Sequence, residues 1–194
     1  MTEGKAIIFS APSGSGKTTI IRRLLTQLEH VQFSISATSR QPRSGERHGE
    51  DYYYLSQEEF QARVEAGDFA EWEEVYEGLR YGTLKSEIAR IWAEGDTILF
   101  DVDVKGGLRL KEFFGDRALA LFVMPPSISV LEQRLRGRAT DDEHSIAKRL
   151  NRAEEELQMS PRFDHTIIND DLNRAVAEAA DQIAQFLRSD APKA

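Results

Sequence analysis

The run from Ile7 to Thr19, which reads IIFSAPSGSGKTT, constrains the fold of this chain more than any other stretch. Residues 11–18 fit the phosphate-binding pattern GxxxxGK(S/T), with Ala11 in place of the first glycine. The pattern requires a strand before it and a helix after it. Residues 7–9 are a compact apolar run typical of a buried parallel strand, and the apolar residues of 20–28 line one face of a helix. We therefore predict an α/β fold built around this loop.

Each fixed position of the loop has a chemical role in binding phosphate. Gly14 and Gly16 can take backbone conformations closed to other residues, which lets N–H groups approach phosphate oxygens. Lys17 would reach the outer phosphates, and the Thr18 hydroxyl would ligate the Mg²⁺ that bridges them. The alternative, a glycine-rich turn that only precedes a helix, does not explain the flanking strand. The predicted nucleotide-binding residues are Ala11, Pro12, Ser13, Gly14, Ser15, Gly16, Lys17, Thr18 and Thr19.

The charge balance argues against some classes of partner. The 194 residues include 25 lysines and arginines against 33 aspartates and glutamates, a formal net charge of −8. A general nucleic-acid-binding protein usually carries a basic excess, so we expect no nucleic-acid partner and only local anion sites. The absence of cysteine excludes disulfides and thiolate metal sites. No apolar run has the length of a membrane span and no signal peptide is evident, so we expect a cytoplasmic protein without a membrane partner.

A positively charged loop follows the first helix. Residues 34–49 carry Arg40, Arg43 and Arg47 against one acid, Glu46, which gives a local charge of +2 in an acidic chain. Arginines on a surface loop are usually only solvated, but their planar donor groups also suit a phosphate. The charge pattern alone leaves both interpretations open.

Residues 34–84 predict a β-rich insertion between the first helix and the next strand of the central sheet. Strand patterns cover 31–37 and 52–55. Ser56 and Glu59 predict a capping box for a short helix after the second of these strands.

The central sheet resumes with a strand at 97–102, which leads into two carboxylates. The period of two along a strand places Asp101 and Asp103 on one face at its carboxyl end. Nucleotides bind beyond such strand ends, and an aspartate there is the usual partner of a phosphate-binding loop around Mg²⁺. We therefore expect Asp101 to reach the metal through a bound water. The alternative is that both aspartates cap a helix before Gly106 and Gly107.

Two more strands are predicted at 118–124 and 165–168, with a helical pair between them. The predicted caps of these two helices are Ser129 with Glu132 and Thr140 with Glu143.

The helical pair is locally basic. Residues 133–152 carry six basic residues against three acids, a local charge of +3: Arg134, Arg136, Arg138, Lys148, Arg149 and Arg152 against Asp141, Asp142 and Glu143. Arginines on both sides of a turn could close over phosphates as a lid. The alternative is a solvated helix pair with salt bridges, and the charge alone slightly favours this alternative.

One phosphate-binding loop and two arginine-rich segments indicate phosphoryl transfer between two anions. A monophosphate acceptor needs no strong base, because a phosphate with a second pKa of about 6 is largely a dianion at neutral pH. Catalysis would instead offset the repulsion between the anions with Mg²⁺, Lys17 and arginines. The four histidines show no metal-ligand spacing: His30, His48, His144 and His165.

The sequence closely resembles the guanylate kinase family, P-loop enzymes that phosphorylate GMP from ATP, over nearly its whole length. The resemblance rests on SAPSGSGK in the loop, SATSRQPRSGERHGEDY in the insertion, and FAEW, YGT, DVDVKGG, GRATDDEHSIAKRL and IINDDL further along. One departure is Lys105, where many relatives have glutamine.

The resemblance implies a role for each matching residue, with Mg²⁺ as the cofactor of ATP on Thr18. The implied catalytic residues are Lys17, Arg40, Arg43, Arg138 and Arg149. ATP would be bound by the loop together with Arg134, Arg138 and Asn169. The implied GMP-binding residues are Ser36, Arg40, Arg43, Tyr52 and Tyr81 at the phosphate, Glu71, Thr83 and Asp103 at guanine, and also Asp101 and Arg149.

The fold implied by the resemblance is a P-loop parallel sheet core flanked by helices, formed by 1–33, 85–132 and 153–194. A β-rich GMP-binding insertion at 34–84 and a helical lid at 133–152 would complete it. One alternative is the guanylate-kinase-like binding module of scaffold proteins, in which the loop is typically degraded. Another is a kinase of a phosphorylated sugar, which has no use for guanine contacts such as Glu71 and Asp103. The sequence makes no prediction of oligomeric state.

Overall fold

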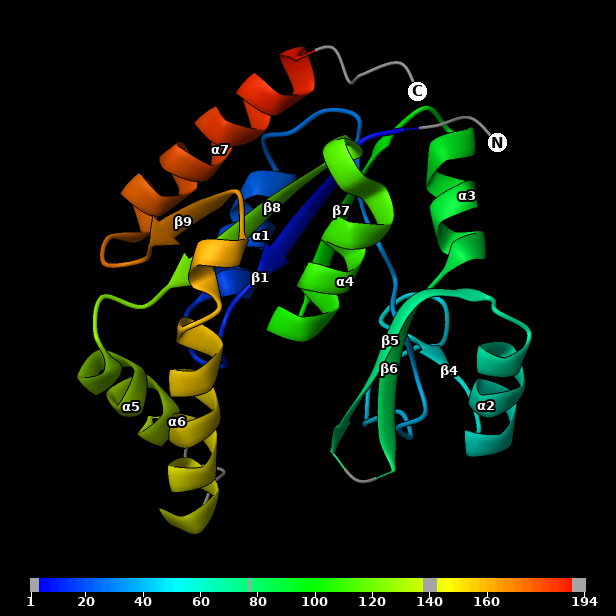
Figure 1. Ribbon diagram of the computed structural model, residues 1–194, viewed down its shortest axis with the longest axis horizontal. Helices are drawn as coiled ribbons and strands as arrows, with labels where there is room; N and C mark the ends of the chain where they lie inside the picture. Colours follow the sequence, from blue (N-terminus) through cyan, green and yellow to red (C-terminus); the bar gives the residue numbers. More distant parts are fainter. Residues whose placement is uncertain (1–3, 77, 138–142, 190–194) are drawn as a thin grey trace.

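The computed structural model describes residues 4–76, 78–137 and 143–189, and a parallel sheet of five strands lies at its centre (Figure 1). The order across this sheet is β2-β7-β1-β8-β9. The strands are β1 (Ala6–Ser10), β2 (Val31–Phe33), β7 (Thr97–Val102), β8 (Ala118–Met124) and β9 (His165–Ile168). Every residue of β1 is buried, as expected for a strand covered on both faces.

Helices cover both faces of the central sheet. On one face, Ile7 and Phe9 of β1 pack with α1 (Lys17–Leu25) and α7 (Leu172–Arg188). On the other, Ala6 and Ile8 pack with α3 (Lys85–Ala93) and α4 (Val104–Phe114). The alternation along β1 therefore divides the core into two layers, one on each side of the sheet.

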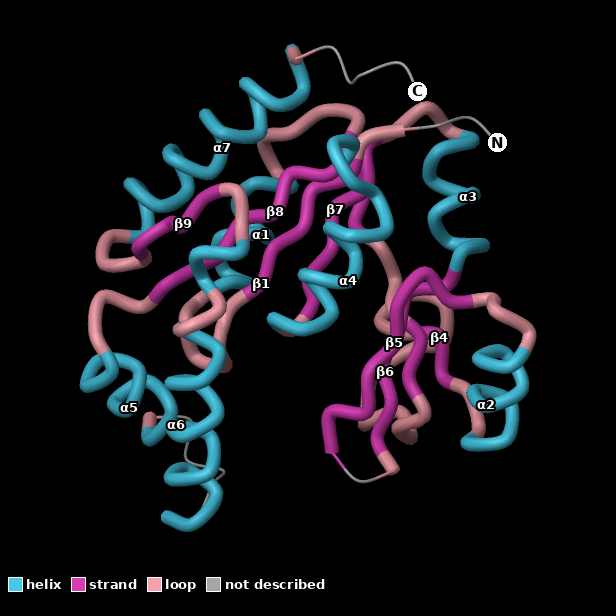
Figure 2. The backbone as a smooth tube through the Cα atoms, in the orientation of Figure 1, coloured by secondary structure: helices cyan, strands magenta, loops and turns pink. Residues whose placement is uncertain are grey.

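A second sheet belongs to a separate lobe, here called the small lobe (residues 34–84), which stands beside the central sheet (Figure 2). Its order is β4-β3-β6-β5, from β3 (Ala37–Thr38), β4 (Tyr53–Tyr54), β5 (Phe69–Tyr76) and β6 (Leu79–Leu84). Helix α2 (Gln57–Glu65) packs on this sheet through Phe60, whose ring stacks on Phe69 with centroids 4.6 Å apart. The small lobe thus has a core of its own.

Two further helices form a pair on the opposite side from the small lobe (Figure 1). They are α5 (Ile128–Arg136) and α6 (Glu143–Leu157), and they pack through Leu131, Leu135 and Ala153. Short 3₁₀ helices cover Gly115–Arg117 and Ser160–Arg162. The start of β1 and the end of α7 lie at the other end of the molecule, away from both the small lobe and the helical pair (Figure 1). Within the described residues, no helix combines the length and the apolar character needed to cross a bilayer.

The predicted fold class is confirmed, and so are the strands at 97–102, 118–124 and 165–168. The capping box of Ser56 and Glu59 is also confirmed, since each side chain accepts the other's backbone N–H.

Two local predictions are wrong. The single strand over 31–37 is two strands in different sheets, because the backbone leaves the central sheet after Phe33 and crosses into the small lobe. The cap of α5 is Ser127, which accepts from the N–H of Val130 at 3.2 Å, and not Ser129 with Glu132. An N-cap accepts from a residue two or three positions later, so Ser127 fits a helix that begins at Ile128.

Thr140, the other predicted cap, lies outside the described residues. The predicted lid at 133–152 includes the end of α5, which begins at Ile128, and much of α6, which ends at Leu157. The division into core, insertion and lid stays a prediction.

Leu24 should be a sensitive point of the core, because it is fully buried on α1 between the central sheet and α7. We expect Leu24→Ala to lower the free energy of unfolding by about 2–5 kcal/mol, from lost burial and a residual cavity. Urea denaturation followed by circular dichroism measures this change. Leu28→Ala, at a partly buried position of the same cluster, is the matched control and should cost clearly less. Equal losses would contradict the packing described here.

Candidate functional site

The phosphate-binding loop connects the end of β1 to the start of α1. Gly14 and Gly16 have φ values of 92° and 90°, in the left-handed region that favours glycine. A turn closes the loop, with the N–H of Ser15 donating to Pro12 O at 3.2 Å. Gly16 is the N-cap residue of α1, so the loop ends where backbone N–H groups are free to bind an anion.

The end of β7 lies against the first turn of α1. Lys17 Nζ is 2.7 Å from Asp101 Oδ1 and also donates to Val102 O, and Thr18 Oγ1 donates to Asp101 Oδ2 at 3.2 Å. This arrangement follows from the parallel pairing of β1 with β7, in which Phe9 lies opposite Asp101. The structure therefore brings together the lysine, the hydroxyl and the carboxylate that the sequence singled out.

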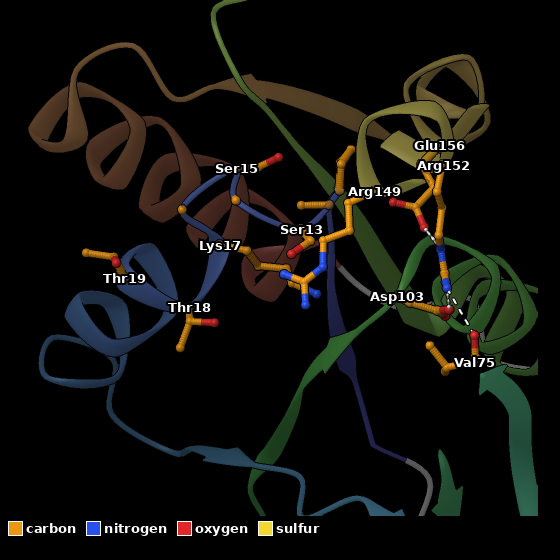
Figure 3. Close-up of a pocket in the computed structure, with 14 residues that line it drawn as sticks. Ser13, Ser15, Lys17, Thr18, Thr19, Val75, Asp103, Arg149, Arg152 and Glu156 are labelled. Carbon is orange, nitrogen blue, oxygen red and sulfur yellow. Dashed lines mark hydrogen bonds and ion pairs between the residues drawn. The ribbon is translucent and has the colours of Figure 1, made fainter. Parts of the chain in front are cut away.

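A pocket of about 310 Å³ lies over the loop, and several basic side chains line it (Figure 3). Lys17 approaches it from α1, and Arg149 and Arg152 approach it from α6 (Figure 3). Its lining consists of residues 11–19 together with Val75, Asp103, Arg149, Arg152 and Glu156. A concave surface with Lys17, Arg149 and a row of backbone N–H groups suits a polyphosphate. The charge of Arg152 is paired with Asp103 and Glu156.

Asn169 and Arg134 brace the loop from behind. Asn169 is 6% exposed and donates through Nδ2 to Ser15 O at 2.7 Å. Arg134 donates to Ser15 O at 3.3 Å and to Asn169 O at 3.1 Å. A Cβ at Gly16 would collide with Asn169 Nδ2, which is a second reason for glycine there. Both residues support the loop in this structure, and their contact with ATP stays a prediction.

A second pocket of about 400 Å³ adjoins the first. Thr18, Val75 and Asp103 line both pockets, so the two cavities share a wall at the carboxyl end of the central sheet. Six predicted GMP-binding residues line the second pocket: Ser36, Tyr52, Glu71, Tyr81, Asp101 and Asp103.

Glu71 is the most deeply buried carboxylate of the second pocket, with 7% exposure. Its Oε1 accepts a hydrogen bond from Thr83 Oγ1 at 2.8 Å. Burial raises the pKa of Glu71 to about 7, the hydrogen bond from Thr83 opposes this rise, and the nearby charge of Asp103 adds to it. Gly106 leaves the necessary room, because a Cβ there would stand 3.1 Å from Glu71 Oε2. The lining therefore holds an acid that titrates near neutral pH.

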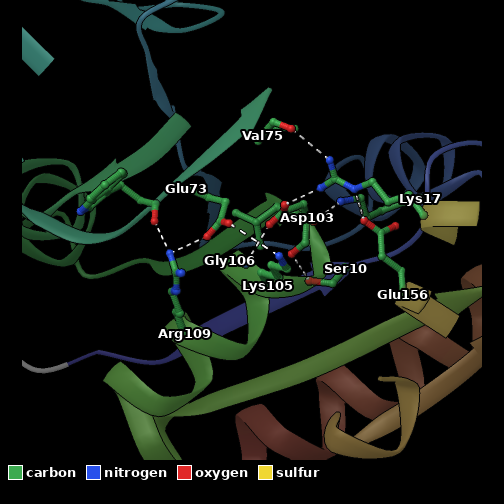
Figure 4. A network of polar contacts seen from close by, with 12 residues as sticks. Ser10, Lys17, Glu73, Val75, Asp103, Lys105, Gly106, Arg109 and Glu156 are labelled. Carbon is green, nitrogen blue, oxygen red and sulfur yellow. Dashed lines mark hydrogen bonds and ion pairs between the residues drawn. The ribbon is translucent and has the colours of Figure 1, made fainter. Parts of the chain in front are cut away.

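Asp103 caps a helix and also lines both pockets. Its Oδ1 accepts from the N–H of Gly106 at 2.8 Å, which caps α4, so the helix-cap alternative is confirmed for this residue. Its Oδ2 accepts from Arg152 Nη2 at 3.1 Å. In Figure 4 Asp103 lies at the centre of a polar network, with Glu73 and Arg109 on one side and Lys17 and Glu156 on the other. Asp101 differs, since its oxygens face Lys17 and Thr18.

Arg40 lies beside Tyr52, a residue that lines the second pocket. Its guanidinium makes two hydrogen bonds to Glu46, at 2.8 and 3.0 Å, and lies 5.2 Å from the ring centre of Tyr52. The Arg40 side chain and the N–H of Arg43 hold the pKa of Glu46 down at about 2. Among the described residues, the lining of this pocket does not include Arg40 or Arg43. Their contact with a phosphate stays a prediction.

The comparison with known proteins agrees with this geometry. The family model described as guanylate kinase matches residues 3–186. A curated guanylate kinase of Bacteroides thetaiotaomicron is 51% identical over 96% of this chain and 92% of its own length, and one of Porphyromonas gingivalis is 52% identical over 94% and 98%. The chain belongs to the guanylate kinase family.

A solved structure supports the same assignment. The crystal structure of guanylate kinase from Anaplasma phagocytophilum matches with a TM-score of 0.75 and 26% identity, over 97% of this chain and 89% of that one. Members of the guanylate kinase family are ATP-dependent nucleoside monophosphate kinases, and this chain is such an enzyme. The sugar-kinase alternative is thereby excluded.

Not every residue that the family resemblance assigned can be located. Arg138 lies outside the described residues, whereas Arg149 lines the pocket over the loop. Lys105, the departure from the family pattern, is exposed at 4.0 Å from Glu73. Among the described residues, no group of three or more His, Cys, Asp or Glu side chains could hold a metal on its own.

Sequence reasoning missed three residues that line the pocket over the loop: Val75, Arg152 and Glu156. Val75 contributes its backbone carbonyl, which accepts from Arg152, and a carbonyl leaves no trace in a residue pattern. In the sequence, Arg152 is distinguished only as part of a basic segment. Its spacing of three from Arg149 places both on one helix face, and this was the available indication.

The raised pKa of Glu71 predicts a stability change with pH. Between pH 4.5 and about 7 the folded state holds a proton that the unfolded state releases, so Glu71 lowers stability as pH rises through this window. Glu71→Gln removes that loss, and we expect it to gain up to about 3 kcal/mol relative to wild type on going from pH 5 to pH 8. Urea denaturation at both pH values measures it. Glu29→Gln, at an exposed position, is the control. A Glu71→Gln difference that is the same at both pH values would contradict the assignment.

Proposed function

We propose that this protein transfers the terminal phosphoryl group of ATP to GMP, giving ADP and GDP. One observation carries the proposal: a pocket over the phosphate-binding loop and a pocket containing a buried carboxylate share Thr18, Val75 and Asp103. Phosphoryl transfer needs two anions held in line with water excluded, and two adjoining pockets meet this need. The names of the curated relatives support GMP as the acceptor.

ATP binds in the pocket over the loop, with its phosphates against the N–H groups of 11–19. Lys17 lies within this pocket, and Arg149 faces it from α6. Both side chains stabilise the negative charge that moves from ATP to the acceptor. Arg138 is assigned to the same role by the family resemblance.

The donor set beside the loop fits Mg²⁺. Thr18 Oγ1 and Asp101 Oδ2 lie 3.2 Å apart, and both are hard oxygen donors of the kind that Mg²⁺ prefers. Mg²⁺ in such enzymes is usually bound by substrate phosphates and one or two protein groups, with its other ligands water. Thr18 would bind it directly and Asp101 through a water. When bound, Mg²⁺ neutralises phosphate charge during transfer.

GMP binds in the second pocket with its phosphate toward the first. The hydroxyl groups of Ser36, Tyr52 and Tyr81 donate hydrogen bonds to the phosphate, and Arg40 and Arg43 supply charge. Arg40 has five N–H donors, so its two hydrogen bonds to Glu46 and its hydrogen bond to Gln41 O leave others for a phosphate. The acceptor oxygen needs no base, because the phosphate is largely a dianion at neutral pH.

Guanine is recognised by its hydrogen-bond donors. Its N1–H and 2-amino groups can both donate to Glu71, and Asp103 can accept a further amine hydrogen. Thr83 orients Glu71 from behind through the hydrogen bond at 2.8 Å. Two donors from guanine favour the ionised form of this carboxyl and so lower its raised pKa. We place the reaction in purine nucleotide metabolism and the protein in the cytoplasm.

The acceptor preference is the direct test of this function. Adenine N1 is an acceptor and would face a carboxylate with no proton between them, which leaves a buried charge partly unpaired. A site built for a substrate's donors rejects such an analogue by roughly 10⁴-fold or more, so AMP should be a very poor acceptor. ADP release with GMP, AMP, CMP and UMP measures kcat/KM for each. Values for AMP and GMP within tenfold of each other would refute the proposal.

Lys17 should be indispensable to transfer but not to folding. We expect Lys17→Ala to lose more than about 10³-fold in kcat while the far-ultraviolet circular dichroism stays unchanged, because its charge acts in the transition state. Activity within tenfold of wild type would remove Lys17 from this role.

A further inference from the structure

Arg152 makes one hydrogen bond within its own helix and donates to two parts of the molecule that are distant in the sequence. Extending from α6, its Nη2 donates to Asp103 Oδ2 at 3.1 Å, at the junction of β7 and α4. Its Nη1 donates to Val75 O of β5 at 3.3 Å, in the small lobe. Its Nε donates to Glu156 Oε1 at 2.7 Å, one turn further along α6 (Figure 3). The helical pair, the core and the small lobe therefore meet at one guanidinium.

The position of this contact is at the wall between the two pockets. Val75 and Asp103, which accept from Arg152 outside its own helix, line both cavities. Val75 lies where the register of β5 against β6 shifts between Glu74 and Tyr76. A shift of this kind interrupts the strand ladder, and Val75 O is the carbonyl there that accepts from Arg152.

Arg152 is itself held in place. Glu156 is 9% exposed, burial raises its pKa, and the hydrogen bond from Arg152 opposes that rise. A guanidinium presents its donors in one rigid plane, so fixing Nε on Glu156 also fixes the direction of both Nη groups. Lysine could supply the charge but not these three directions.

The consequence for Asp103 is that both carboxylate oxygens are anchored. Gly106 N–H holds Oδ1 at 2.8 Å and Arg152 holds Oδ2 at 3.1 Å, which fixes the carboxylate plane while lone pairs remain on each oxygen. Asp103 is also close enough to Glu71 for its charge to raise the pKa of Glu71. A cation on Asp103 offsets this repulsion between the two acids.

We propose that Arg152 is a positioning residue for guanine recognition, which acts through Asp103 and ties acceptor selection to the placement of α6. This inference rests on the proposed function, because it assigns Asp103 to the 2-amino group of guanine. The competing explanation is an ion pair of purely structural value, since the Arg152 side chain is 34% exposed and pairs of that kind contribute little. The two explanations differ in what they predict for substrate preference.

The test compares GMP with IMP, whose base keeps N1–H and lacks the 2-amino group. We expect Arg152→Ala to reduce kcat/KM for GMP by at least about tenfold, chiefly through KM, and that for IMP by less than about threefold. The KM for ATP should stay within about threefold. Lys148→Ala removes a cation from an exposed position of the same helix and should leave all three values unchanged.

If the role of Arg152 were purely structural, Arg152→Ala would lower kcat/KM for GMP and for IMP by the same factor. An unchanged ratio of kcat/KM for GMP to that for IMP therefore overturns the inference. Arg152→Lys keeps the charge and should restore the ratio only in part, because one ammonium cannot hold three acceptors in one plane. Full restoration by lysine would show that charge alone is required and would also overturn it.

A double-mutant cycle tests whether Arg152 acts through Asp103. Asp103→Asn keeps a good N-cap for α4, so the helix should remain intact. In this background we expect Arg152→Ala to change the GMP-to-IMP ratio by less than about twofold. If Arg152→Ala changed the GMP-to-IMP ratio by the same factor in the Asp103→Asn background as in wild type, Arg152 would not act through Asp103. A wild-type enzyme inactive on GMP would refute the proposed function itself, whereas an active wild type with an indifferent Arg152→Ala would refute only this inference.

Discussion

The parallel pairing of β1 with β7 is the constraint on which the rest of the site depends. It sets Phe9 opposite Asp101 and Ser10 opposite Val102, so the phosphate-binding loop and the acidic end of β7 leave the sheet together. A slip of one residue would turn each side chain of β7 to the other face, and Asp101 would then point away from Lys17 and Thr18. The buried residues of both strands oppose such a slip, because alternate side chains along each strand pack into the two core layers on opposite faces of the sheet. Hydrophobic packing thereby fixes the position of the Asp101 carboxylate beside the loop.

The small lobe contains a buried carboxylate, Glu71, which its own sheet must stabilise. Glu71 lies on β5 with Thr83 of β6 beside it, so two adjacent strands supply the carboxylate and its hydrogen-bond donor. The lobe is tied to the core along α4, where Arg109 donates to Trp72 O and lies 2.6 Å from Glu73 (Figure 4). A pKa near 7 for Glu71 means that this burial is costly in the absence of a ligand. A substrate with matching donors recovers that cost on binding, which favours the matching base.

The sequence predicts most of the fold and the loop, because those rest on patterns that are local in the chain. The apolar runs at 97–102 and 118–124 and the glycines of the loop need no knowledge of distant partners. Apart from the cap of α5, which is Ser127 and not Ser129, the failures come from long-range contacts. The break after Phe33 depends on the second sheet, and the role of Arg152 depends on a carbonyl of β5 and a carboxylate some 50 positions earlier in the chain. The family resemblance supplied Glu71 and Tyr81, which no spacing rule would have joined to the loop.

The cations of the site are paired in advance, although the chain is acidic overall. Lys17 forms an ion pair with Asp101, Arg40 with Glu46, and Arg152 with both Asp103 and Glu156. Pairing orients each cation before substrate arrives, but it also reduces the field that an anion meets. Arginine loses little by this arrangement, because its five donors can serve a carboxylate and a phosphate together. Lys17 has only three donors, two of them engaged by Asp101 and Val102, so phosphate must share or displace these partners. If Lys17 acts in transfer as we propose, its pairing with Asp101 and Val102 therefore opposes the binding of ATP at that residue.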